Sequence, residues 1–167
     1  MLTLYLIRHA KSSWDDPLQT DFHRPLNARG LRDAPAMAAH FAARKETAQL
    51  LVSSPAARAL ATAQYVADAL GMDRGTIKLE PKLYLADLPT WRTVMNDLPQ
   101  TVKSVALFAH NPGISECCEW LTGSGTGELP TCAMVRIDME VDEWKALSKG
   151  TGTIRWYDFP KRHPHLQ

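Results

Sequence analysis

Four basic side chains in this chain of 167 residues lie just after three short apolar runs. Runs of this kind, rich in branched or aromatic residues and ended by polar ones, predict buried β-strands. Because open α/β sheets bind ligands at the carboxyl ends of their strands, we expect the four side chains to lie together. They are Arg8 and His9 after residues 2–7, Arg58 after residues 49–53, and His110 after residues 104–109.

Two guanidinium groups and two imidazoles around one point are suited to binding a compact dianion such as phosphate. The amino end of the helix that Ser54 and Pro55 are expected to open would add to this site. An ion pair at a strand end explains any one of the four equally well. Four cations packed without an anion would repel one another, so a structural role for the whole set is unfavourable.

Strand and helix patterns alternate along the chain, which predicts an α/β fold. We expect a three-layer α/β/α sandwich with a mostly parallel sheet and an antiparallel edge, in one domain spanning 1–167. A loop over 12–25, a connector over 122–130 and a frayed tail over 161–167 complete it. Strands are expected at 2–7, 49–53, 76–80, 104–109, 134–139 and 153–159, and helices after Asn27 (with a kink or a later start at Pro35), over 54–71, over 87–98, after Gly113 and over 143–147.

Composition excludes several classes of function. The formal net charge is +1, from 19 basic and 18 acidic residues, which gives no reason to expect a nucleic-acid surface. No apolar stretch approaches the roughly 20 residues of a membrane helix. Cys117, Cys118 and Cys132 have no metal-ligand spacing, so we interpret them as core residues of a cytoplasmic protein.

Three segments resemble the signature segments of the histidine phosphatase superfamily, which includes phosphoglycerate mutases and fructose-2,6-bisphosphatase. Within it, residues 9–14 (HAKSSW), 21–26 (DFHRPL) and 110–113 (HNPG) resemble the SixA-type phosphohistidine phosphatases, and the resemblance extends from Leu2 to about Pro160. The superfamily segments are 6–10 (LIRHA), 53–59 (SSPAARA) and 109–112 (AHNP).

The resemblance implies a phosphoglycerate mutase-like fold and a role for each basic residue. His9 would attack phosphorus and carry a phosphohistidine intermediate, while Arg8, Arg58 and His110 would hold the phosphoryl oxygens. His9 must then present one unprotonated ring nitrogen, so its other nitrogen should donate to a backbone carbonyl. Neither a metal nor another cofactor is required.

One departure from the superfamily pattern bears on the substrate. Relatives that cleave phosphomonoesters carry a mid-chain glutamate that protonates the leaving oxygen, whereas residues 81–86 contain no carboxylate. Either Asp21, Glu80 or Asp87 takes over this role, or no residue does. The absence favours a phosphoramidate, such as phosphohistidine in a histidine phosphocarrier or phosphotransfer domain. A small-metabolite phosphomonoesterase and a non-catalytic phosphate- or phosphopeptide-binding module remain as alternatives.

Further residues are candidates for contacting substrate. Lys11 and Ser13 follow His9 closely enough to line the pocket mouth, and Trp14 lies in the same loop. Arg24 either orients this loop or touches substrate, and Asn111 either shapes a turn or donates to phosphate. The short chain leaves little room for a cap, so we expect a shallow pocket. We interpret His23, His40, His163 and His165 as surface residues.

Overall fold

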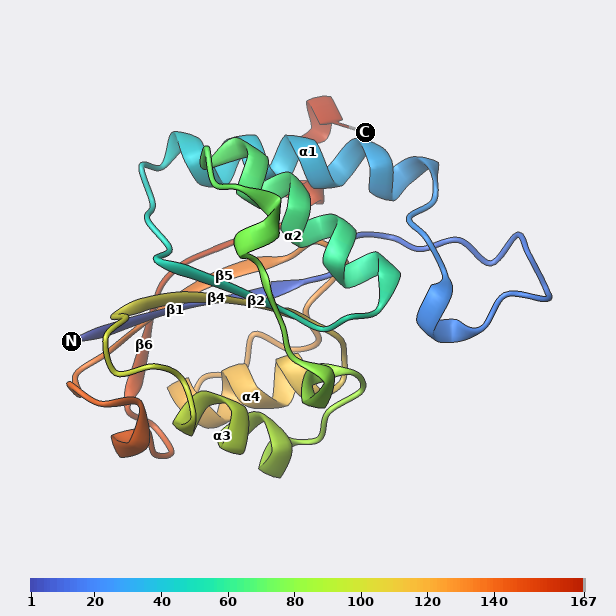
Figure 1. Ribbon diagram of the computed structural model, residues 1–167. Coiled ribbons are helices and arrows are strands. Elements are labelled where there is room, and N and C mark those ends of the chain that lie inside the picture. The colour runs from blue at the N-terminus through green and yellow to red at the C-terminus, as the bar shows by residue number, and fades with distance from the viewer. Residues whose placement is uncertain (167) are drawn as a thin grey trace.

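The computed structural model describes residues 1–166, and a six-stranded sheet lies at its centre (Figure 1). The strand order is β3-β2-β4-β1-β5-β6, with the first four strands parallel and the last two antiparallel to their neighbours. The predicted mostly parallel sheet with an antiparallel edge is therefore confirmed. The strands are β1 (Leu2–Arg8), β2 (Leu50–Ser53), β3 (Lys78–Leu79), β4 (Ser104–Ala109), β5 (Met134–Met139) and β6 (Gly152–Asp158).

Two helices cover each face of the sheet and complete the predicted three layers (Figure 1). Side chains of β1 alternate between the faces, as the period of a strand requires. Leu4 and Leu6 join the core on the α3 and α4 side, whereas Tyr5 and Ile7 join the core on the α1 and α2 side. The helices are α1 (Ala28–Ala43), α2 (Ala57–Ala69), α3 (Leu88–Asn96) and α4 (Gly113–Thr122).

The register of the parallel strands levels their carboxyl ends. Arg8 lies opposite Ala109 across β1 and β4, and Ser53 lies opposite Phe108 across β2 and β4. The three strands therefore end at nearly the same level along the sheet. The pairing of β1 with β4 continues one residue further, since the amide of His9 donates to the carbonyl of Ala109 at 3.1 Å. The predicted convergence at one sheet edge follows from this register.

Helix α2 begins later than the sequence predicts. We expected Ser54 as its cap and Pro55 at its first position, but the helix starts at Ala57 with Ala56 as cap. The Ser54 amide still donates to the Phe108 carbonyl at 2.9 Å, so Ser54 prolongs the sheet instead of opening the helix. The predicted role of a helix start at Ser54 is therefore wrong, although Arg58 does lie in the first turn.

Other boundaries also differ from the predictions. Pro35 lies inside α1, which begins at Ala28 after the Asn27 cap, so Pro35 does not mark the start of the helix. The segments 143–147 and 76–80 reduce to a 3-10 turn (Trp144–Ala146) and the two-residue β3. The tail predicted to be frayed forms 3-10 turns over Pro160–Arg162 and Pro164–Leu166, and Gln167 lies outside the described residues.

Candidate active site

A pocket of about 220 Å³ lies where β1, β2 and β4 end, beside the loop 12–25 that extends from the body of the molecule (Figure 1). The four basic residues singled out from the sequence all line it. Its volume is below the roughly 300–1,000 Å³ of most small-molecule sites. The lining residues are Arg8, His9, Lys11, Ser12, Trp14, Arg24, Arg58, Leu85, His110, Asn111 and Thr131.

His9 has one ring nitrogen tied to the backbone. Its Nδ1 lies 2.7 Å from the carbonyl oxygen of Ala10, and since a carbonyl only accepts, Nδ1 carries the proton. The lone pair of the neutral ring is therefore on Nε2. The pKa of His9 is lowered to about 3. Burial is the largest cause, His110 and Arg58 add to it, and the hydrogen bond to Ala10 acts in the opposite direction. The ring is thus an uncharged base at neutral pH, with the tautomer predicted from the sequence.

His110 is held by Ser54, which lies 56 residues before it in the sequence. Its Nε2 lies 2.7 Å from the Ser54 hydroxyl oxygen, and its ring centroid is 5.1 Å from that of His9. Burial and the positive charge of Arg58 lower the pKa of His110 to about 3. The two imidazoles therefore lie side by side without mutual charge repulsion.

Two of the three arginines of the pocket, Arg24 and Arg58, share one carboxylate. Asp21 accepts from Arg58 Nη2 at 3.1 Å and from Arg24 Nη2 at 3.0 Å, and its second oxygen also accepts from the Tyr84 hydroxyl at 2.6 Å. Among the described residues, Arg8 donates only to a neutral group, the carbonyl of Leu129, at 2.7 Å. Positive charge is therefore in excess here, as an anion site requires.

Three residues of the pocket also keep unused hydrogen-bond donors or acceptors. Arg8 Nε, Arg58 Nε and His110 Nδ1 are buried and have no hydrogen-bond partner among the described residues. Buried polar groups normally find partners within the protein. Three of the six such side-chain atoms among the described residues lie in this one pocket, which indicates that its residues have a role beyond stabilising the fold.

Comparison with known proteins identifies the family of this chain. A sequence profile of the histidine phosphatase superfamily (branch 1) matches residues 4–151. The chain belongs to the histidine phosphatase superfamily. An uncharacterized chloroplastic protein of Arabidopsis thaliana is 27% identical over 161 residues, covering 92% of this chain and 73% of its own.

Solved structures extend this comparison to the fold. A protein of Agrobacterium tumefaciens provisionally named the phosphohistidine phosphatase SixA superposes with a TM-score of 0.78 at 27% identity, over 95% of this chain and 98% of its own. The protein histidine phosphatase SixA in complex with tungstate gives a TM-score of 0.82 at 22% identity, over 96% and 99%. This histidine phosphatase therefore has the SixA-type, phosphoglycerate mutase-like fold, and it is an enzyme of the phosphatase class.

Not all residues that the sequence suggests as substrate contacts of this histidine phosphatase line the pocket. Lys11 and Asn111 line the pocket, although the Asn111 amide already donates to the Leu129 carbonyl at 2.8 Å. Arg24 also lines the pocket, and its guanidinium donates to Ser12 in the loop. Both roles predicted for it, orienting this loop and touching substrate, fit this position. Ser13 is not among the residues that line the pocket. Its neighbour Ser12 lines the pocket and accepts from Arg24 Nη1 at 2.7 Å, and a substrate contact of Ser13 stays a prediction.

The three candidate acids, Asp21, Glu80 and Asp87, differ in where they lie relative to the pocket. Asp21 does not line the pocket, but it holds two arginines that do. Partial burial raises the pKa of Asp21, yet hydrogen bonds from Tyr84, Arg24 and Arg58 outweigh this effect and lower the pKa to about 2. Glu80 and Asp87 accept from the amides of Lys82 and Thr90 and so cap short helical segments away from the pocket. No residue that lines the pocket is acidic within the described part of the chain.

Several contributors were missed by sequence reasoning. Leu85 and Thr131 line the pocket, and Ser54 and Tyr84 support it from behind. Tyr84 lies within residues 81–86, the segment in which the superfamily pattern predicts a glutamate. The pattern therefore pointed to this segment, although it predicted a different residue type. Leu85 and Thr131 belong to no recognisable motif.

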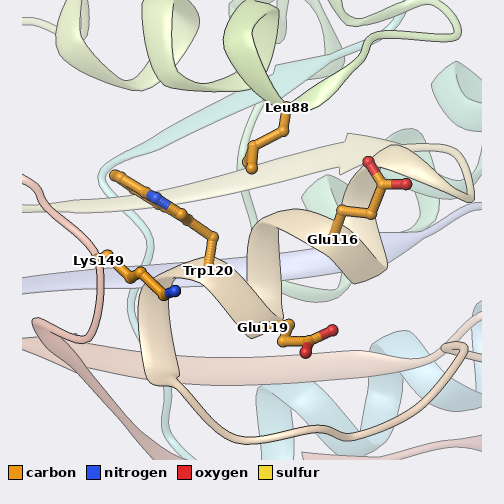
Figure 2. A pocket seen from close by; sticks show the side chains of 5 residues that line it. All are labelled: Leu88, Glu116, Glu119, Trp120 and Lys149. Atoms are coloured by element: carbon orange, nitrogen blue, oxygen red, sulfur yellow. The ribbon is translucent and has the colours of Figure 1, made fainter.

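A second hollow, of about 280 Å³, lies between α3 and α4, and Figure 2 shows its lining side chains. Two glutamates and Trp120 come from α4, with Leu88 at the start of α3 and Lys149 from a loop. This hollow holds no histidine and no pair of cations. It therefore offers nothing to a phosphoryl group.

Proposed function

We propose that this enzyme, acting as a single domain over 1–167, removes the phosphoryl group from phosphohistidine in a partner protein through a covalent intermediate on His9. The single observation that carries the proposal is the His9 ring, neutral, buried and fixed by Ala10 with its Nε2 lone pair free, among cationic side chains. A pure binding site has no use for a fixed, unprotonated imidazole.

The proposed reaction has two displacements. In the first, His9 Nε2 forms a bond to phosphorus while the bond between phosphorus and the substrate imidazole breaks. In the second, water attacks phosphorus, the bond to His9 breaks and inorganic phosphate leaves. The His9 proton stays on Nδ1, hydrogen-bonded to Ala10, through both steps.

Arg8, Arg58 and His110 would hold the three non-bridging oxygens, where negative charge gathers in the transition state. Their guanidinium and imidazole donors supply the positive field, so the proposed chemistry needs no metal. Asp21 would act on Arg58 from behind, since its carboxylate accepts from Arg58 Nη2 at 3.1 Å. Lys11 and Arg24 at the pocket edge would orient the substrate.

The lack of an acid in the pocket supports a phosphoramidate substrate. Asp21 is ionised at neutral pH, and Glu80 and Asp87 lie elsewhere, so none of the three is placed to protonate a leaving alkoxide. The substrate imidazole can carry a proton on the ring nitrogen that is not bonded to phosphorus, so it leaves as a neutral ring. An ester oxygen must instead receive its proton as its bond to phosphorus breaks. Transfer between two imidazoles is also close to isoenergetic.

Exposed apolar residues beside the pocket support a protein as substrate. The side chains of Trp14 and Leu85 line the pocket and are 72% and 58% exposed, and Leu18 in the same loop as Trp14 is 92% exposed. Aromatic and large apolar side chains are enriched where proteins bind one another. A phosphocarrier or phosphotransfer domain would place its phosphohistidine in the pocket and its surface on this rim.

The compartment is a further part of the proposal. Cys117, Cys118 and Cys132 are buried and free, as in proteins of a reducing cytoplasm. Within residues 1–166 no helix is long and apolar enough to cross a bilayer.

The test is a phosphoenzyme trap with a radiolabelled phosphohistidine carrier protein. The wild type and His23→Ala, which removes an exposed histidine outside the pocket, should become labelled, whereas His9→Ala should not. Turnover by His9→Ala should fall by about 10⁴-fold or more, as when other catalytic nucleophiles are removed. Labelling of His9→Ala would overturn the mechanism.

The same assay with sugar phosphates tests the alternatives. Rates on sugar phosphates far above those on phosphohistidine would replace the proposed substrate by a small metabolite. Binding of phosphate without any label on His9 would replace the enzyme by a binding module.

A further inference from the structure

Three histidines outside the active site gather on one face of α1. His40 is in the last turn of this helix. His163 caps the 3-10 turn Pro160–Arg162, and His165 belongs to Pro164–Leu166, the 3-10 turn that lies against α1. In Figure 1 the red end of the chain lies beside α1, although about 120 residues separate the two segments in sequence. One ring nitrogen of each histidine lies within 4.8 Å of one nitrogen of the other two.

The rings of this cluster are packed, not dispersed in solvent. The rings of His40 and His163 stack with centroids 4.0 Å apart and planes at 19°, and His165 meets both edge-on at about 6 Å. His40 and His163 are half-buried and His165 is exposed. His40 and His163, interpreted from the sequence as surface residues, are therefore only partly exposed and are ordered by the cluster.

A carboxylate fixes one member of the cluster. His163 Nε2 lies 2.8 and 2.9 Å from the two oxygens of Asp158, a carboxylate that also accepts from Arg44 at 3.2 Å. Since a carboxylate accepts, Nε2 carries the proton and the neutral ring keeps its lone pair on Nδ1. A carboxylate behind a histidine is the arrangement that orients ligands in metal sites.

We propose that His40, His163 and His165 bind one transition-metal ion, represented by Zn²⁺, which ties the segment 163–166 to α1. Imidazole ligands suit Zn²⁺, Cu²⁺ and Ni²⁺ and do not suit Mg²⁺ or Ca²⁺. Three histidines and one water complete a tetrahedral shell.

The movement needed to form the site is small. Zn–N bonds of about 2.0–2.1 Å place tetrahedral ligand nitrogens about 3.4 Å apart. The present separations, at most 4.8 Å, close by side-chain rotation, for which the exposed His165 has room. Asp158 would act as a positioning residue, and it already balances the charge of Arg44.

The test is calorimetric titration of ZnCl₂ into the untagged full chain in phosphate-free buffer. We expect one ion per chain, and affinity at least about tenfold weaker in His165→Ala and His40→Ala, since even orienting partners cost 10–100-fold. His165→Ala is the principal variant, because its ring is exposed and its loss leaves the Asp158 contact of His163 intact. His23→Ala, an exposed histidine elsewhere, should bind as the wild type does.

A second measurement separates this site from the imidazoles of the active site. The titration is repeated with His9→Ala, which should still bind one ion, and imidazole NMR signals of His40, His163 and His165 should shift on addition of Zn²⁺. At one hundred times Kd, Zn²⁺ should raise the Tm of the wild type by about 5–10 °C and not that of His165→Ala. Absence of saturable binding, or binding that survives His165→Ala and disappears with His9→Ala, would overturn the proposal.

Discussion

Arginines are used in opposite ways in two regions of this molecule. At the antiparallel edge of the sheet, an outer arginine cluster (Arg44, Arg136 and Arg155) faces three carboxylates. In the active-site pocket, Arg24 and Arg58 share Asp21, and Arg8 forms no ion pair with any described residue. The partners in the outer cluster are Glu46 and Asp138 for Arg136, Asp138 for Arg155, and Asp158 for Arg44, at 2.9–3.2 Å.

The difference shows what each region does. In the outer cluster nearly every charge is satisfied inside the protein, and Glu46 also accepts from Trp156 Nε1 at 2.8 Å. Such a network stabilises one arrangement of β5, β6 and α1 and has little capacity for a ligand. In the pocket, the shortage of carboxylates leaves donors for a phosphoryl group, at the cost of packing positive charges together. Substitutions should therefore separate activity from stability in these two regions.

Among substitutions that compare these two regions, the largest expected effect is that of Arg8→Ala on catalysis. Arg8 forms no ion pair with any described residue, so its loss should leave stability nearly unchanged. Removing one preorganised contact to the transition state should lower kcat by about 10²–10³-fold. Steady-state kinetics on a phosphohistidine carrier and a thermal melt check both halves. A large loss of Tm with a small loss of kcat would mean that Arg8 stabilises the fold, as the arginines of the outer cluster do.

Arg136→Ala should give the reverse result. It leaves Glu46 and Asp138, whose side chains are 8% and 5% exposed, without their shared partner. The free energy of unfolding should fall by about 3 kcal/mol, the lower end for a broken buried pair because Arg136 is partly exposed. Urea unfolding measures this loss, and kcat below the melting temperature should stay within about twofold of wild type. Reduced kcat at full stability would contradict the separation.

Acid should reveal the neutral imidazoles of the pocket. Between pH 6.5 and pH 3 the unfolded chain protonates His9 and His110 while the folded state keeps them neutral, so stability present above pH 6.5 is lost as pH falls. Each group contributes about 1.4 kcal/mol per pH unit in this window. Urea unfolding of His110→Ala between about pH 6 and pH 5 should therefore show a shallower pH dependence than wild type by that amount. Equal slopes would mean that His110 is protonated in the folded state.

The smallest expected effect is that of Asp21→Asn. The amide keeps the size of Asp21 but weakens its hold on Arg58 and Arg24. Loss of one charged hydrogen bond behind the catalytic arginine, about 1.5 kcal/mol, should lower kcat about tenfold. If Asp21 were the acid for the leaving group, Asp21→Asn would instead remove the basic limb of the pH–rate profile, and this measurement distinguishes the roles.

Residue types and their order along the chain determined much of this protein. The apolar runs over residues 2–7 and before His110 are local patterns, and side chains that follow parallel strands must meet at one edge. The four basic residues and the overall layers were therefore predictable. The Nδ1 contact of His9 was predictable too, since it joins neighbouring residues.

Only the tertiary structure decided the contacts that cross the sheet. Ser54 reaches His110 because β2 and β4 are neighbours in register, and Tyr84 reaches Asp21 across 63 residues of sequence. Ser54 also carries the sequence signal of a helix cap, and the sheet ladder overrode it. Local preferences select strands and helices, but which side chain completes a site depends on distances between segments that folding alone brings together.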